Sequence, residues 1–189
     1  MAMSTNTNLT NHFLIAMPRL ADPNFSHTVT YLCGHTEEGA MGVVINRPLD
    51  MNLGEVLGHM NIDTDDQPLR QQPVFIGGPL EPEHGFVLHQ ACRSWKNTLL
   101  ISKEISLTTS SDILQDIAQG NGPTRILVAL GYAAWGAGQL EQEIADNAWL
   151  TTPATSEIVF DLPIETRWRT AATLLGVDLD RLSAEVGHA

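Results

Sequence analysis

The order of strand-like and helix-like segments constrains the fold of this chain more than any other feature. Short β-branched or apolar runs typical of strands outnumber the segments that carry a helical apolar stripe, and the two kinds do not alternate regularly. A doubly wound fold requires such alternation, so the order predicts an α+β fold with a mixed, curved sheet. The predicted strands cover residues 13–17, 27–33, 40–46, 74–78, 85–90, 97–110 and 124–135. The predicted helices cover residues 52–60, 111–120 and 138–145, with a last helix starting at residue 163.

Local signals mark several ends of these segments. The stretch "GHTEEG" between two strand-like runs is typical of a hairpin loop. Asn52 followed by Glu55 predicts a capping box at the start of one helix. Ser111 is predicted to cap the next helix, and Gly120 to follow its end.

The length of 189 residues is enough for one domain with a substantial core and short for two. Hydrophobic residues make up 43% and charged residues 17%, as in an ordinary folded chain. Residues 1–11 are small and polar, which predicts a flexible N-terminal tail. Residues 12–189 are predicted to form a single domain, because no repeat or low-complexity linker interrupts them.

The charge and the apolar runs bound the partners and the compartment. A formal net charge of −12 repels phosphate backbones, and the ten basic residues are scattered, so we do not expect direct nucleic-acid binding. No apolar run approaches the ~20 residues that span a bilayer, and no secretory segment opens the chain. Cys33 and Cys92 are expected to stay free in a reducing compartment. We therefore predict a cytoplasmic protein without membrane contact.

Metal, cofactor and nucleophile patterns do not stand out in the sequence. His84 and His89 are five positions apart, so on one strand they face opposite sides of the sheet. Cys33 and His35 share a face, but no second pair at zinc-finger spacing accompanies them. No phosphate loop, dinucleotide fingerprint, nucleophile elbow or zinc-protease motif is present. We predict no metal, no cofactor and no identifiable catalytic residue.

The stretch "GYAAWGAGQLEQEI" leads from the most apolar strand into a helix. Its glycines require sharp turns or close packing, and no Ser, Thr or Asp caps the helix that follows. An uncapped helix start behind glycines is the usual form of an anion site, but Glu141 already complements the helix dipole there. Gln139 and Glu143 share a helix face, so they are the side chains that would border a cleft. The stretch is either a packing junction or the rim of a ligand site.

Three separated motifs resemble the bacterial YqgE/AlgH family: "ADPNFSHTVTYLCGHTEEGAMGVVINRPL", "FIGGPL" and "GYAAWGAGQLEQEIADNAWL". The resemblance implies a single-domain α+β fold with a bifurcated, partly barrel-like sheet surrounded by helices. It implies no chemistry, although some members carry the label of transcriptional regulator. The matching motif positions are Asn46, Arg47, Pro48, Gly77, Gly78, Pro79, Gly131, Tyr132, Trp135, Gly136, Gly138, Gln139, Leu140 and Glu141. Ala137 and His27 depart from the family pattern, which commonly has proline and arginine there.

The three motifs each end an apolar strand, which leads to a hypothesis about a site. If the three strand ends converge on one surface, Arg47 is the fixed cation that could grip a carboxylate or phosphate. The predicted ligand- or partner-binding residues are Asn46, Arg47, Pro48, Gly77, Gly78, Pro79, Trp135, Gly138, Gln139 and Glu143.

Three functions remain open from the sequence. The first is a binding or interaction protein, with a regulatory role, that recognises a protein partner or a small anionic ligand. The second is an enzyme acting on a small anionic substrate held by Arg47, with Glu143 or a histidine as acid/base group. The third is a transcriptional regulator, for which the acidic charge disfavours direct DNA binding.

Overall fold

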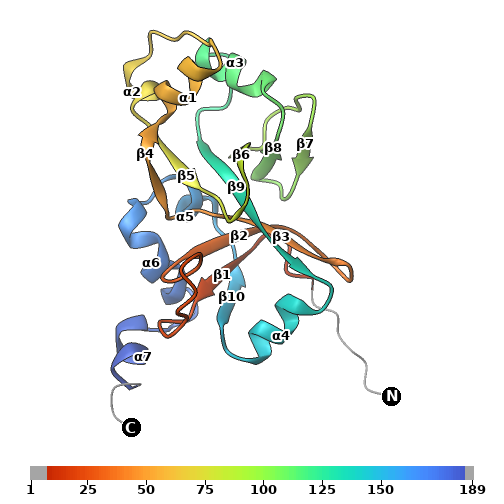
Figure 1. Cartoon of the computed structure of the whole chain (residues 1–189), viewed down its shortest axis with the longest axis vertical. Helices are drawn as coiled ribbons and strands as arrows, with labels where there is room; N and C mark the ends of the chain where they lie inside the picture. Colours follow the sequence, from red (N-terminus) through yellow and green to blue (C-terminus); the bar gives the residue numbers. More distant parts are fainter. Residues whose placement is uncertain (1–7, 186–189) are drawn as a thin grey trace.

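The computed structural model of the chain describes residues 8–185 (Figure 1). Its strands are β1 (His12–Ala16), β2 (Val29–Thr36), β3 (Gly39–Val44), β4 (Pro48–Asn52), β5 (Pro73–Ile76), β6 (Leu80–Gln90), β7 (Thr98–Leu100), β8 (Ile105–Thr108), β9 (Ile126–Gly136) and β10 (Trp149–Pro153). Its helices are α1 (Leu53–His59), α2 (Gln67–Arg70), α3 (Asp112–Ala118), α4 (Gln139–Ala145), α5 (Ser156–Phe160), the 3₁₀ turn η1 (Ile164–Thr166), α6 (Arg167–Thr173) and α7 (Leu179–Glu185).

Strand β9 joins two halves of one ten-stranded sheet. The strand order is β10-β1-β2-β3-β9-β6-β8-β7, and β5 adds a parallel partner to β9 with β4 beside it. The second half of β9 pairs with β3, from Gly136 opposite Gly39 to Ala133 opposite Gly42. Its first half pairs with β5 and β6 instead, so the sheet divides along β9 (Figure 1). The predicted α+β fold with a mixed, bifurcated sheet surrounded by helices is confirmed.

The buried side chains form three apolar clusters. One spans both halves of the sheet, from β1, β2 and β3 to β5, β6, β8 and β9, and includes residues of α5 and α6. In it, Trp168 donates its indole N–H to the carbonyl of Ala16 at 2.9 Å. A second surrounds Trp135 and Trp149 beneath α4. The third joins α1 and α3 to the first half of β9, with Leu57 and Ile113 almost fully buried. Among the described residues, no helix has both the length and the apolar character needed to cross a bilayer.

Most of the local signals in the sequence are confirmed. The "GHTEEG" stretch forms the β2–β3 hairpin, and the side chains and backbones of Asn52 and Glu55 complete the capping box of α1. Gly120 follows α3 with a φ of 78°, in the left-handed region that glycine adopts freely. Ser111 is the N-cap residue of α3 as predicted, but its hydroxyl makes no capping bond. The Asp112 carboxylate satisfies the backbone N–H of Ile113 instead, so the serine is not needed there.

The predicted flexible tail is wrong for residues 8–11, while residues 1–7 lie outside the described part of the chain. Leu9 is buried against the Trp135 cluster, and its backbone N–H donates to Nδ1 of His35 at 2.9 Å. The backbone of Asn11 bonds to Leu32 and to Ala154, and its side chain accepts from the Tyr31 hydroxyl. These contacts order the segment despite its polar composition.

Candidate functional site

Two of the three predicted strand-end segments lie side by side. The backbone N–H of Ile76 donates to the carbonyl of Arg47, and that of Val44 donates to the carbonyl of Gly77, both at 2.8 Å. This pairing brings Asn46–Pro48 next to Gly77–Pro79. A Cβ on Gly78 would lie 2.1 Å from the carbonyl carbon of Tyr132, so this glycine is needed to pack the segment against β9.

The third segment lies at the other end of β3. Trp135 pairs with Ala40 near the start of β3. The strand ends at Val44, four positions after Ala40, and Asn46 lies just beyond this end. At about 3.3 Å per residue, four positions separate the two ends by roughly 13 Å. Gly138, Gln139 and Glu143 continue away from β3 into α4, which Figure 1 places far from β4 and β5. The structure therefore brings the first two motifs together against the start of the third, at Gly131 and Tyr132, and leaves Trp135 and the α4 residues of the third motif apart.

Arg47 and Asn46 hold a loop of the protein itself. The Arg47 guanidinium donates to the carbonyl of Asn24 at 2.7 Å and to that of Ser26 at 3.2 Å. The Asn46 side chain accepts from the N–H of Val29 and donates to the carbonyl of His27, both at 2.9 Å. An anion at Arg47 would have to compete with these backbone contacts.

Glu143 covers an aromatic cluster beneath α4. Trp135 packs against Phe25 and Trp149, with ring centroids 5.9 and 6.1 Å apart. Burial raises the pKa of the Glu143 carboxyl, although the nearby indole groups of Trp135 and Trp149 partly offset this. Oε2 of Glu143 and Nε1 of Trp149 are both buried without a hydrogen bond to any described residue. The residue is a carboxylate in an apolar setting, which costs free energy when it is ionised.

The start of α4 is occupied by the protein's own carboxylate. Glu141 accepts from Nε2 of His35 at 2.6 Å, and its own backbone N–H together with this histidine lowers the pKa of the carboxyl. Since Nδ1 of His35 accepts from Leu9, the proton of the neutral ring sits on Nε2. The Gln139 side chain closes the turn by accepting from the N–H of Gly136 at 2.9 Å. These contacts favour the packing-junction interpretation of "GYAAWGAGQLEQEI" over an anion site.

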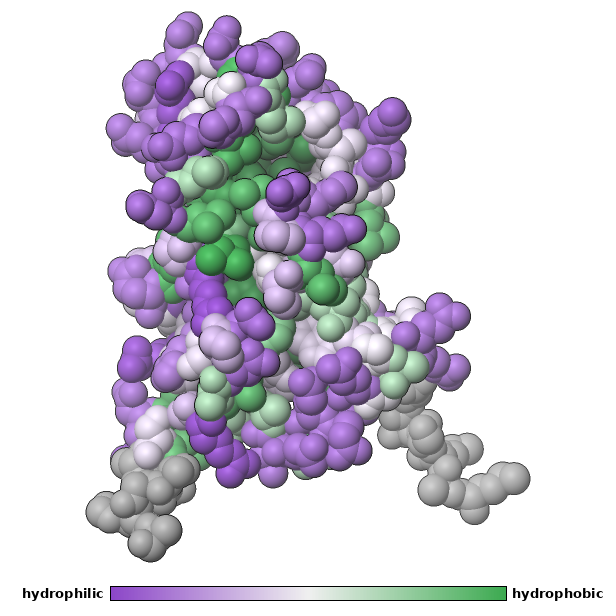
Figure 2. Space-filling model, viewed as in Figure 1, coloured by the Kyte–Doolittle hydropathy of each residue, from purple (hydrophilic) through white to green (hydrophobic). Residues whose placement is uncertain are grey.

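A large hollow that could bind a ligand lies elsewhere, between α1 and α3, and we call it the α1–α3 groove. It encloses about 750 Å³. Figure 2 shows its apolar side chains as a green recess in the upper half of the molecule, flanked by hydrophilic residues. The groove is lined by Met51, Val56, His59, Met60, Glu83, Gly85, Val87, Thr108, Thr109, Ser110, Ser111, Leu114, Val128 and Leu130.

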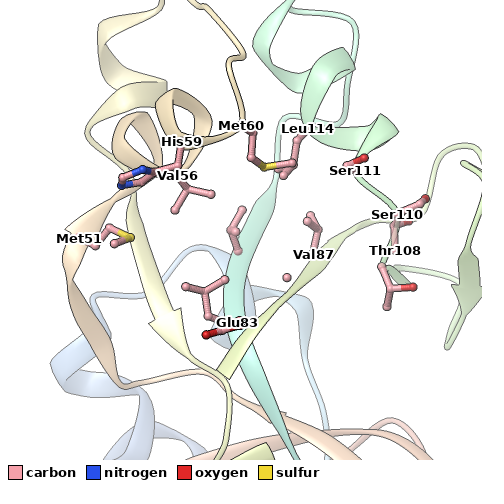
Figure 3. Close-up of a pocket in the computed structure, with 14 residues that line it drawn as sticks. Met51, Val56, His59, Met60, Glu83, Val87, Thr108, Ser110, Ser111 and Leu114 are labelled. Carbon is pink, nitrogen blue, oxygen red and sulfur yellow. The ribbon is translucent and has the colours of Figure 1, made fainter. Parts of the chain in front are cut away.

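The floor and one wall of the groove are apolar. Val87 and Val128 are each only 3% exposed and come from the paired strands β6 and β9. Gly85 leaves the floor open, because a Cβ built on it meets no atom within 4 Å. Met51 and Met60 project from β4 and the end of α1 (Figure 3), and thioether side chains adapt to varied apolar shapes.

The rim of the groove is polar and partly unused. Within the described chain, the side chains of His59, Glu83 and Ser111 make no hydrogen bond or ion pair. Figure 3 places His59 on one side, Ser111 on the other and Glu83 at the lower end. Ser110 donates to Asp112 at 2.5 Å, which is the largest cause of the lowered pKa of that carboxyl and fixes the α3 side of the rim.

Sequence reasoning missed this groove because its residues come from six strands and helices, β4, α1, β6, β8, α3 and β9, that are spread along the chain. Val56 and Met60 were visible as part of an apolar helical stripe, but such a stripe normally faces a core. Across the described residues, no three His, Cys, Asp or Glu side chains lie close enough to hold a metal ion. Cys33 is buried, Cys92 is exposed, and both are free.

Comparisons with known proteins place the chain among close relatives. The family model described as AlgH-like matches residues 13–180. A UPF0301 protein of Nitrosococcus oceani is 54% identical over 187 residues, which cover 99% of this chain and 100% of that protein. A UPF0301 protein of Thioalkalivibrio sulfidiphilus is 56% identical over the same length, with the same coverage.

Two solved structures share the fold. The solution structure of the AlgH protein from Pseudomonas aeruginosa has a TM-score of 0.80 and 50% identity, and the match covers 100% of both chains. A crystal structure of a Corynebacterium diphtheriae protein has a TM-score of 0.75 at 21% identity, covering 96% of this chain and 95% of that one. The second likeness concerns the fold alone. None of these names specifies a reaction, a ligand or a partner.

Proposed function

Because the chain belongs to the AlgH-like family, we propose that it is a binding protein that holds a small amphipathic molecule in the α1–α3 groove. The observation that carries the proposal is the groove itself: about 750 Å³ with an apolar floor and a polar rim. Small-molecule sites typically have this size, this apolar lining and a few polar groups that orient the ligand.

The ligand chemistry follows from the division between floor and rim. An apolar body would displace water from Val87, Val128 and the two methionines, at about 25 cal/mol for each Å² of apolar surface removed from water. A polar end would reach His59, Glu83 or Ser111, whose side chains have no other partner within the described chain. This separation supports recognition of an amphipathic molecule.

We also propose that the protein is cytoplasmic and that it makes no direct contact with DNA. Free cysteines are the usual state in a reducing compartment. Four arginines are paired with carboxylates of the same chain, which reduces the positive surface that a phosphate backbone would meet. A regulatory role would then act through the bound molecule rather than through nucleic acid.

Gly85→Leu tests the proposal, because the new side chain fills the floor of the groove without meeting other atoms at its Cβ. We expect the variant to bind the fluorescent probe 1-anilinonaphthalene-8-sulfonate at least about tenfold more weakly than the wild type, as expected when a bulky group occupies an apolar pocket. Fluorescence titration of the folded proteins measures this. Native mass spectrometry of the wild type, purified gently from its own cells, would reveal the natural ligand.

Gly58→Leu is the matched control. Gly58 is an exposed residue of α1, a Cβ there also meets nothing within 4 Å, and the residue does not line the groove. Equal probe affinity for Gly85→Leu and the wild type would refute the proposal, as would an equal loss in both variants.

A further inference from the structure

A second, smaller hollow lies on the opposite face of β9, and we call it the Arg167 hollow. It encloses about 230 Å³ between the starts of β5 and β9 and the α5–α6 connection. Leu127 faces this hollow, whereas its neighbour Val128 faces the α1–α3 groove, as expected for successive residues of a strand. The two hollows are therefore separate. The polar side chains that line the second one are Gln72, Thr124, Arg125, Asp161 and Arg167.

Arg167 is a buried cation with no direct ion-pair partner in the described part of the chain. Its side chain is 6% exposed, and its guanidinium donates to the carbonyls of Leu162 at 3.1 Å and Ile45 at 2.7 Å. It also lies over the ring of Phe75, 5.4 Å from the centroid. All three partners are neutral. Burial lowers the pKa of Arg167 to about 10, although the charges of Asp161 and Glu165 partly offset this.

Asp161, the carboxylate among the residues that line the hollow, already forms an ion pair with Arg125. Asp161 accepts from Nε of Arg125 at 3.1 Å through one oxygen and from Nη2 of Arg125 through the other. Within residues 8–185, Arg167 has no carboxylate within ion-pair distance. Among the residues that line the hollow, two arginines and one aspartate carry a net charge of +1, while Asp161 and Glu165 attract Arg167 only beyond ion-pair distance. A buried charge of this kind is costly unless a partner neutralises it.

Unused donors also line the hollow. Nη2 of Arg167 makes no hydrogen bond with the described residues. This nitrogen is not fully buried, so a ligand in the hollow can reach it. The side chains of Gln72 and Thr124 likewise have no hydrogen-bond partner in the described part of the chain. Donors beside a guanidinium that has no ion pair with the described residues match the oxygens of an anion.

We propose that the Arg167 hollow binds a small oxyanion, a phosphate or a carboxylate group, with Arg167 as its counter-charge. The volume is below that of a typical drug-sized pocket, so the ligand is a small anion or the anionic end of a molecule that extends into solvent. This site uses none of the groove residues and does not depend on the function proposed for the groove.

The experiment titrates the folded, ¹⁵N-labelled protein with inorganic phosphate and, separately, with succinate, while chloride keeps the ionic strength constant. We expect saturable shifts of the Arg167 Nε–H signal and of the backbone amides of residues 124–127. A response to phosphate alone assigns a phosphate ligand, a response to succinate alone assigns a carboxylate, and a response to both assigns the shared oxyanion chemistry.

Two variants separate the site from general charge effects. Thr124→Glu, at an exposed position, places a carboxylate of the chain at the hollow, and we expect it to weaken anion binding at least about tenfold. Arg169→Met removes a nearby exposed arginine that does not line the hollow, and we expect it to bind the anion like the wild type. The absence of saturable shifts with both anions, or unchanged binding by Thr124→Glu, would overturn the proposal.

Discussion

Two carboxylates that stand two positions apart on α4 experience opposite environments. Glu141 accepts hydrogen bonds from His35 and from its own backbone, which lowers its pKa. Glu143 is turned toward the aromatic cluster, where burial raises its pKa. On a helix, positions i and i+2 face different directions, so neighbouring acids can meet solvent and core separately. The two residues therefore make opposite contributions to stability.

Glu143→Gln is expected to stabilise the protein at pH 7. Because the folded-state pKa is raised, the contribution of Glu143 to stability is present below its unfolded pKa and is lost as the pH rises through the folded value. At pH 7 the ionised, buried carboxylate is a cost, which the amide removes. We expect a gain of about 1 kcal/mol in the free energy of unfolding at pH 7, and almost none near pH 4. Urea denaturation at both pH values measures this, and a variant less stable at pH 7 would contradict it.

Glu141→Gln is expected to act in the opposite direction. Its folded-state pKa is lowered, so its contribution is present above the unfolded pKa, near 4, and is lost as the pH falls through the folded value. The side chain is 44% exposed, so solvent screening keeps the loss at pH 7 below about 1 kcal/mol. The same denaturation series checks it: the wild type should lose more stability than the variant as the pH falls below 4. Parallel curves would argue against the His35 contact.

The glycines of the Gly77–Pro79 segment allow the end of β5 to approach the backbone of β9 closely. A Cβ on Gly78 would lie 2.1 Å from the carbonyl carbon of Tyr132, and one on Gly77 would lie 2.2 Å from the carbonyl oxygen of Gly131. Both obstacles are backbone atoms, which cannot rotate away. The "GG" of the second motif is therefore a packing requirement at the end of β5, whatever else the motif does.

Gly78→Ala should destabilise the protein strongly, because β5 must separate from β9 to accommodate the methyl group. We expect a loss of about 3 kcal/mol in the free energy of unfolding, at the upper end of overpacking effects. Gly58→Ala is the control, since its Cβ meets open space on α1 and alanine favours a helix. Chemical denaturation of both variants checks the difference, and equal stability would show that β5 yields easily.

Local patterns of the sequence predicted the elements well, because their causes are local. The β2–β3 hairpin, the Asn52–Glu55 capping box and the apolar run that becomes β9 are each encoded within a few consecutive residues. Arg47 was predicted as the fixed cation because it follows a strand. Only the structure shows that loop carbonyls hold it.

The α1–α3 groove and the Arg167 hollow could not be predicted from the sequence, because each depends on contacts between segments that are distant in the chain. The α1–α3 groove forms only when β4, α1, β6, β8, α3 and β9 meet. The burial of Arg167 depends on contacts with Ile45, which is 122 positions away. Whether the three strand ends form one surface depends also on the relative directions of the strands, which the sequence does not show. β3 and β9 are antiparallel, so the end of β9 lies beside the start of β3.

The shared strand β9 sets the order in which this molecule can be completed during its synthesis. Strands β3, β5 and β6 leave the ribosome before β9, and each lacks one of its two neighbours until β9, which ends at Gly136, has been made. β1 waits longer for its second neighbour, since β10 ends at Pro153. Contacts so distant in sequence slow folding and leave one edge of each strand uncovered in the meantime. We therefore expect this sheet to be completed only after most of the chain has been translated.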